Sequence, residues 1–109
     1  MSTISVEKDF SRYPGGRYKT DGPYSGEQFR DEILIPALQR SREPIELDFA
    51  GVLGAPTSWL EEVFGGLIRK GVPWEEFEGR VLLRNLSIER QMTAMVCASD
   101  EDLRQKGEI

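Results

Sequence analysis

Histidine is absent from the chain, and cysteine occurs only once, at position 97. These absences exclude a disulfide framework, a zinc site of the usual cysteine and histidine type, and catalysis by a serine–histidine or cysteine–histidine pair. No run of about 18 apolar residues is present, so the sequence predicts no transmembrane helix. Basic residues are the minority: 14 Lys and Arg stand against 19 Asp and Glu, and this acidic balance disfavours binding to nucleic acid.

What remains is the composition of a small globular domain. A chain of 109 residues, 39% of them hydrophobic, has room for one core and little more. The first ten residues lack the basic and apolar regions of a secretory signal, so we expect a cytoplasmic protein. No residue pattern indicates a cofactor, and Cys97, beside two apolar residues, is interpreted as a small buried hydrophobe.

Short segments bounded by glycine and proline alternate between strand and helix patterns. Strands are predicted at residues 3–6, 45–49 and 81–83, with an edge strand at 17–20, and helices at 25–40, at 58–71 and from 87 onward. This alternation predicts a single α/β domain over residues 1–99, with a central mixed or mostly parallel sheet and helices packed against it. Residues 100–109 are predicted to form a charged tail that frays.

Three helix features can be predicted from residue spacing. Ser25 with Gln28, and Ser58 with Glu61, have the spacing of capping boxes at helix starts. Pro36 lies inside the first helix, where a kink or a new helix start is expected because proline removes a backbone donor. In the last helix the apolar residues again fall on one face, the pattern of an amphipathic helix. They are Ile88, Met92, Met95 and Val96.

Gly65 and Gly66 lie opposite the apolar stripe of the second helix, among charged residues that include Glu62. Each glycine in a helix interior costs roughly 1 kcal/mol relative to alanine, so two of them require a reason. We predict the close approach of another backbone, either the N-terminal loop of this domain or a partner protein.

Candidate site residues gather where the central strand turns into the second helix. They are Asp48, Gly51, Gly54, Pro56, Thr57 and Ser58. A carboxylate, two permissive backbone positions and two hydroxyls beside a helix N-terminus suit phosphate binding or phosphorylation. A purely structural interpretation stays open, in which Ser58 caps the helix and Asp48 faces solvent. The loop has no lysine where a nucleotide-binding P-loop needs one, so nucleoside triphosphate hydrolysis is not indicated.

The N-terminal loop is locally basic and aromatic. It contains Arg12, Arg17, Lys19, Tyr13, Tyr18 and Tyr24. Such a mixture can bind phosphates or stack on bases. The alternative is that the tyrosines pack on the sheet while the cations pair with Glu27, Asp31 and Asp48.

The stretch LDFAGVLGAPTSWLEEVFGGLIRKG resembles the strand, loop and helix of STAS domains, the fold of anti-sigma factor antagonists. Asp48 and Gly51 match the family's strand end, Thr57 matches its first hydroxyl, and Ser58 matches the serine that a partner kinase phosphorylates. Pro56 replaces an aspartate of the motif. Trp59 replaces a glycine, so a bulky apolar side chain is expected to cover the loop.

A wider resemblance extends over about residues 4–85. The segments DFSRYPGGRYKTDGPYSGEQFRDEIL, PAL and PTSWLEEVFGGLIRKG resemble a bacterial STAS-like domain family of unknown function. That family sometimes accompanies histidine-kinase-like ATP-binding domains. The resemblance therefore implies a switching partner of this kind.

The leading hypothesis is a non-enzymatic regulatory module that binds a protein partner through residues 53–58 and the adjoining helix face. Ser58 or Thr57 would receive a phosphate, and the interface would add Trp59, Glu62, Gly65, Gly66, Arg17 and Tyr18 to the turn residues. The alternative is a sensor of a small anion or nucleotide held at the amides after Pro56, under the cations of the N-terminal loop. An enzyme acting through Asp48 with Ser58 has the least support, since no base with a near-neutral pKa is visible.

Overall fold

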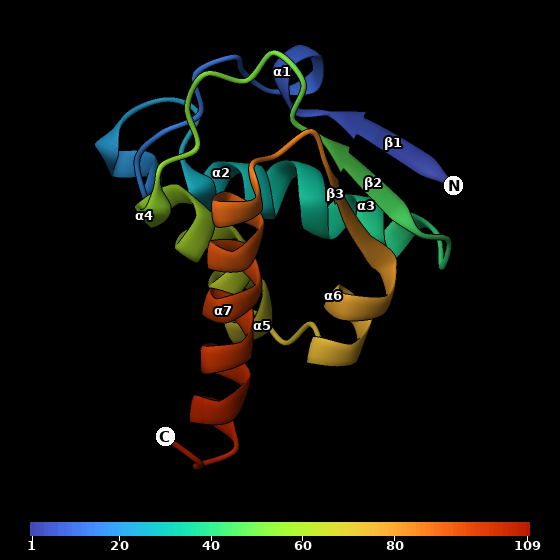
Figure 1. The fold of residues 1–109 in the computed structure, drawn as a ribbon, viewed down its shortest axis with the longest axis vertical. Helices are drawn as coiled ribbons and strands as arrows, with labels where there is room; N and C mark the ends of the chain where they lie inside the picture. The colour runs from blue at the N-terminus through green and yellow to red at the C-terminus, as the bar shows by residue number, and fades with distance from the viewer.

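The computed structural model describes all 109 residues and contains a three-stranded parallel sheet (Figure 1). Its strands are β1 (Ser2–Ser5), β2 (Ile45–Asp48) and β3 (Val81–Arg84), in the order β1-β2-β3. The α/β class and the central place of β2 are confirmed. None of the helices combines the length and the apolar character that crossing a membrane requires.

The edge strand predicted at residues 17–20 is wrong. The carboxylate of Asp21 accepts hydrogen bonds from the amides of Arg17 and Tyr18, at 3.2 and 2.8 Å. These bonds curl the chain back on itself, and Lys19–Asp21 forms a 3-10 turn, η1. Hydrogen bonding to the Asp21 side chain therefore prevents these amides from joining the sheet, although the residue alternation predicted a strand.

The strand order places the helices on one face of the sheet. Both crossovers connect neighbouring parallel strands, and right-handed crossovers in a constant direction put their helices on the same side. Ile45 and Leu47 of β2 point to that side and are buried. Glu46 points to the opposite face, where its carboxylate lies 3.2 Å from Nε of Arg84.

The first long helix runs from residue 26 to 40 as α2 (Gly26–Phe29), the π-helical segment η2 (Arg30–Leu34) and α3 (Ile35–Arg40). Ser25 caps it as predicted, accepting from the amide of Gln28 at 3.1 Å, although the Gln28 side chain bonds the amide of Tyr24 instead of that of Ser25. The amide of Ile35 bonds the carbonyl of Arg30, five residues back. This widened turn precedes Pro36, so the helix continues past the proline without a new start.

The second long helix runs from residue 57 to 69 as α4 (Thr57–Leu60), the π-helical segment η3 (Glu61–Gly65) and α5 (Gly66–Arg69). The helix ends at Arg69, and Gly71 is the left-handed residue that follows the C-cap, as predicted. Gly71 has φ of 98° and donates to the carbonyl of Ile68, while Val72 donates to that of Leu67. These two bonds form a Schellman motif, which favours glycine at the left-handed position.

Three further helices complete the chain: α1 (Val6–Asp9), α6 (Trp74–Arg80) and α7 (Ile88–Gln105). The helix α7 begins where predicted, and Ser87 caps it by accepting from the amide of Arg90 at 3.2 Å. The helix does not end at residue 99. Glu101 lies in the region predicted to fray, but it is buried and its carboxylate is 3.3 Å from Arg69.

The apolar face predicted for the last helix is exposed to solvent. Its exposed fractions are 74% at Ile88, 61% at Met92, 36% at Met95 and 53% at Val96. The buried positions of α7 are instead Ala94, Ala98 and Glu101. Small side chains allow α7 to pack closely on the second long helix, so the helix turns its larger apolar side chains outward.

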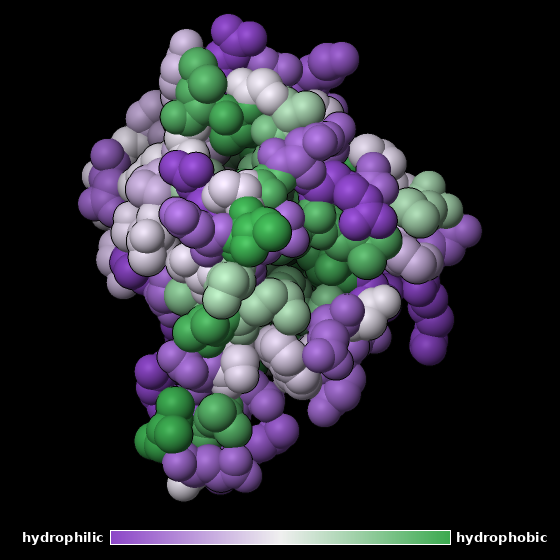
Figure 2. Space-filling model, viewed as in Figure 1, coloured by the Kyte–Doolittle hydropathy of each residue, from purple (hydrophilic) through white to green (hydrophobic).

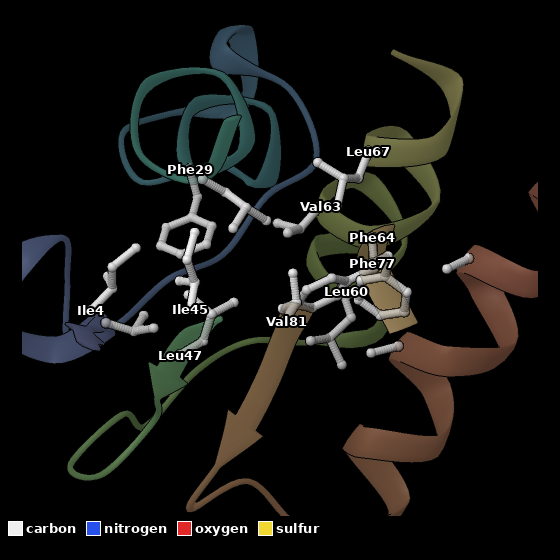
Figure 3. Packing of buried hydrophobic residues seen from close by; sticks show 14 of the residues in the cluster. Ile4, Phe29, Ile45, Leu47, Leu60, Val63, Phe64, Leu67, Phe77 and Val81 are labelled. Atoms are coloured by element: carbon white, nitrogen blue, oxygen red, sulfur yellow. The ribbon is translucent and has the colours of Figure 1, made fainter. Parts of the chain in front are cut away.

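The core forms between the covered sheet face and the two long helices (Figure 3). Phe29 of α2 lies over β2, and Phe64 of η3 meets Phe77 of α6 with ring centroids 5.5 Å apart. Cys97 is only half-buried, not fully buried as its apolar neighbours predicted.

Candidate functional site

Asp48 ends β2 and ties the loop that follows to the end of β3. Its Oδ1 accepts from the amide of Ala50 at 2.9 Å and from Nδ2 of Asn85 at 2.8 Å. Hydrogen bonds from Asn85 and then from Ala50 lower the pKa of Asp48. Asp48 is therefore held ionised, as a local link between strand ends.

The loop after β2 is braced by the N-terminal segment. The amide of Leu53 donates to the carbonyl of Arg12 at 2.7 Å, and the amide of Ala55 donates to that of Pro14 at 2.8 Å. A Cβ at Gly54 would lie 2.3 Å from the Pro14 carbonyl oxygen, so only glycine permits this approach. Two main-chain bonds thus fix the loop that carries the candidate residues.

The second long helix begins one residue earlier than predicted, and this changes which hydroxyl is exposed at the site. The amide of Leu60 bonds the carbonyl of Pro56, so Pro56 is the N-cap and Thr57 is the first helical residue. Ser58 lies inside the first turn, is half-buried and accepts no capping bond. The predicted capping box of Ser58 and Glu61 is therefore wrong, and Thr57 is the exposed hydroxyl.

Trp59 is part of the core, not a cover over the loop. It is fully buried, and its Nε1 donates to the carbonyl of Tyr24 at 3.1 Å. Its ring packs against Phe29 and Phe49, with centroids 5.2 and 6.3 Å away. In this position Trp59 cannot contact a partner protein.

Glu62, Gly65 and Gly66, predicted as interface residues, are also buried. A Cβ at Gly66 would lie 2.3 Å from Nη1 of Arg30, and one at Gly65 would lie 2.4 Å from the carboxylate of Glu61. The prediction of an approaching backbone is corrected: the glycines make room for charged side chains. The interface can therefore not include the helix face on which these three residues lie.

The cations of the N-terminal loop are engaged within the chain. Arg17 bonds Glu61 and also Glu62, at 3.3 Å from the latter. The hydrogen bond that Arg17 donates to Glu61 raises the pKa of Arg17 against the opposing effect of burial. The remaining pairs are Arg12 with Glu7 at 2.9 Å and Lys19 with Glu32 at 3.5 Å. None of the three cations pairs with the carboxylates expected from the sequence.

The tyrosines of the same loop are not packed on the sheet. Tyr13 is 64% exposed, Tyr18 49% and Tyr24 42%. Leu53 is 68% exposed, and its amide bonds the residue before Tyr13. The sequence placed Leu53 at the start of the partner-binding loop, residues 53–58, but did not single out its side chain as exposed.

Sequence reasoning also missed a polar hollow of about 330 Å³ between the starts of α4 and α7. Its lining is Pro56, Thr57, Ser87, Glu89, Arg90 and Thr93. Arg90 reaches across from α7, donating through Nε to the carbonyl of Ala55 at 3.2 Å. The exposed hydroxyl of the second long helix thus lies beside a guanidinium that no sequence motif connects to it.

The parallel sheet, the braced loop and the helix that begins at Thr57 define a small α/β domain. A family model described as a STAS-like domain of unknown function (DUF4325) matches residues 25–90, which is more than half of the chain. The protein belongs to this family, as the sequence resemblance indicated. No curated protein and no solved structure matches it.

Proposed function

We propose that this chain is a non-enzymatic regulatory module that binds a protein partner through Tyr13, Leu53 and Thr57, here named the loop surface. Leu53 carries the proposal, because its side chain projects into solvent from a loop held by main-chain bonds. An apolar side chain presented by a rigid loop loses little conformational entropy on binding. The exposed ring of Tyr13 adds an aromatic side chain of the kind that dominates protein interfaces.

The partner that we propose is a histidine-kinase-like ATP-binding protein, the kind that the family resemblance implies. It would transfer the terminal phosphoryl group of ATP to the hydroxyl oxygen of Thr57, with release of ADP and the hydroxyl proton. We choose Thr57 over Ser58 because Thr57 is exposed and Ser58 is half-buried within the helical turn.

A phosphate on Thr57 would be electrostatically favoured. It would stand at the N-terminus of the second long helix, whose free amides attract anions. The guanidinium of Arg90 lines the same hollow and would attract the phosphate, and the carboxylate of Glu89 in the same lining opposes it in part. The modification adds about two negative charges to the loop surface and so changes the charge of the surface that the partner contacts.

The test is isolation of the tagged chain from its own cells, with mass spectrometry of the co-purified proteins and of phosphate at each hydroxyl. We expect an ATP-binding kinase-like protein to co-purify with the native chain and with Met92→Asp, a matched control on another surface. Leu53→Asp is expected to lose this partner, and Thr57→Ala to lose the phosphate. Retention of the partner by Leu53→Asp, or phosphate confined to Ser58, contradicts the proposal.

One observation favours the alternative, a sensor of a small anion. The polar hollow contains Arg90 and three hydroxyl side chains. Against it, the loop cations invoked for this function are already paired with carboxylates. Thermal unfolding with inorganic phosphate or ATP distinguishes the two: a ligand at 100 times its dissociation constant adds about 2.7 kcal/mol of stability. Stabilisation that disappears in Arg90→Ala would favour the sensor.

A further inference from the structure

The helix α7 presents its large apolar side chains to solvent and its small ones to the domain. Ile88, Met92, Met95 and Val96, here named the α7 face, lie along the outer side of the helix. Figure 2 shows hydrophobic side chains gathered along the upper part of this helix on the viewed face. Single exposed apolar residues are ordinary, but a row of them on one helix face indicates an interaction site.

The outward direction of this face is fixed by polar contacts on the inner side of α7. Arg90 donates to the carbonyl of Ala55, and Gln105 donates through Nε2 to the carbonyl of Ile68 at 3.2 Å. Between them, Glu101 meets Arg69 at 3.3 Å. These contacts stand at helical spacing on one side of α7, so the helix cannot rotate to bury its apolar face without losing all of them.

Carboxylates border the α7 face along one edge. Glu89, Val96 and Asp100 are spaced by seven and four residues and therefore share a side of the helix. Neither Glu89 nor Asp100 forms an ion pair in the structure, whereas Asp102 is paired with Lys106 at 2.9 Å. The apolar row thus has an acidic border with two unneutralised charges.

We infer that the α7 face binds an amphipathic helix of a partner protein whose apolar stripe is flanked by lysine or arginine. The face offers apolar side chains at i, i+4, i+7 and i+8, the spacing through which a partner helix is held. Its two methionines adapt to the side chains of such a helix. A second copy of this chain is disfavoured as the occupant, because it would bring the same acidic border against Glu89 and Asp100.

The α7 face does not rest on the proposed function, and it meets the loop surface only where its border residue Glu89 lines the same hollow as Thr57. The two sites make opposite predictions for the same pair of variants. Leu53→Asp removes an apolar side chain from the loop surface alone, and Met92→Asp removes one from the α7 face alone. Each variant therefore serves as the matched control for the other.

The experiment uses two synthetic helical peptides of about five turns, or 18 residues, with leucine in a single stripe. One carries lysine on both sides of the stripe and the other carries glutamate. Titration calorimetry of the full chain is expected to show binding of the lysine peptide only. Met92→Asp should weaken this binding about tenfold or more, while Leu53→Asp leaves it unchanged. Glu89→Gln combined with Asp100→Asn should weaken it and reduce its dependence on salt.

Three outcomes overturn the inference. The first is no binding of the lysine peptide, and the second is equal binding of the lysine and glutamate peptides. The third is a dimer in sedimentation that Met92→Asp dissociates, which would make a second copy the occupant. Met92→Asp should unfold thermally like the native chain, since its side chain is mostly in solvent, so lost binding cannot be attributed to lost folding.

Discussion

Nη1 of Arg30 lies 2.5 Å from Oε2 of Glu62 and 3.1 Å from its carbonyl oxygen, and both side chains are nearly sealed from solvent. The two residues stand in η2 and η3, so this ion pair joins the two long helices at their π-helical turns. Burying two charges is costly, and the pair is tolerated because each charge has its partner and additional hydrogen bonds. Arg30 is further held by Asp31, at 2.8 Å.

Removing one partner of this pair should destabilise the domain strongly. Glu62→Ala removes one of the two carboxylates that bond Arg30 and leaves the guanidinium paired with Asp31 alone, so we expect the free energy of unfolding in urea to fall by about 1–3 kcal/mol. The control is Glu75→Ala, an exposed carboxylate outside every ion pair, which should change stability by less than about 0.5 kcal/mol. A loss below about 1 kcal/mol for Glu62→Ala would show that the pair contributes little.

Gly66→Ala should destabilise the protein although alanine is the better helix former. The added methyl group would lie 2.3 Å from Nη1 of Arg30, and moving that side chain breaks its bond to Glu62. We expect a loss of about 1–3 kcal/mol, the range for overpacking a core. Gly79→Ala in α6 meets nothing within 4 Å and should instead stabilise by about 0.5–1 kcal/mol. Equal effects of the two substitutions would contradict this explanation of Gly66.

Two serines at predicted helix starts should respond differently to alanine. Ser87 accepts a hydrogen bond from the amide of Arg90, so Ser87→Ala should lower the unfolding free energy by about 1 kcal/mol. Ser58 caps nothing, so Ser58→Ala should cost less than about 0.5 kcal/mol. Thermal or urea unfolding measures both. A larger loss at Ser58 than at Ser87 would restore Ser58 as the N-cap.

Stability should decrease in acid. A hydrogen bond from Arg30 lowers the pKa of Asp31. Burial raises the pKa of Glu61, but hydrogen bonds from Arg69 and Arg17 outweigh it and leave that pKa lowered. Carboxylates whose pKa is lower in the folded than in the unfolded state stabilise the fold above the unfolded value, near pH 4. That stability is lost as the pH falls through the folded values.

We therefore expect the free energy of unfolding to fall steadily below about pH 5 and to stay nearly constant between about pH 6 and 8, where no histidine titrates. Urea unfolding across this range measures the slope. Asp31→Asn should make the acid slope shallower, whereas Glu75→Gln, at an exposed position without an ion pair, should not. An acid slope that is identical in Asp31→Asn and the native chain would reject the role of Asp31.

Local patterns predicted most elements because the interactions behind them are local. The capping bonds of Ser25 and Ser87 and the left-handed turn at Gly71 each depend on residues a few positions apart. The apolar alternation of residues 45–49 predicted β2 and its central place. The prediction of an edge strand at 17–20 was wrong for a local reason too, since the carboxylate of Asp21 accepts hydrogen bonds from the amides of Arg17 and Tyr18.

The site was predicted less well, because its composition depends on contacts between distant segments. Sequence reasoning placed Trp59 and Glu62 on a surface, but Phe29 and Arg30 of another helix bury them. It did not find Arg90 near Thr57, because these residues are brought together only by the packing of α7 on the second long helix.

The sequence by itself determined the α/β class, the family, and the strand, loop and helix that carry the candidate residues, because periodicity and motif spacing are properties of neighbouring residues. Only the tertiary structure decided which hydroxyl is exposed and which face of α7 meets the core. Both faces of α7 bear apolar residues, and the face with the small residues Ala94 and Ala98 is the one that packs on the domain. The α7 face is consequently left in solvent, as is Leu53, whose loop is held by the N-terminal segment.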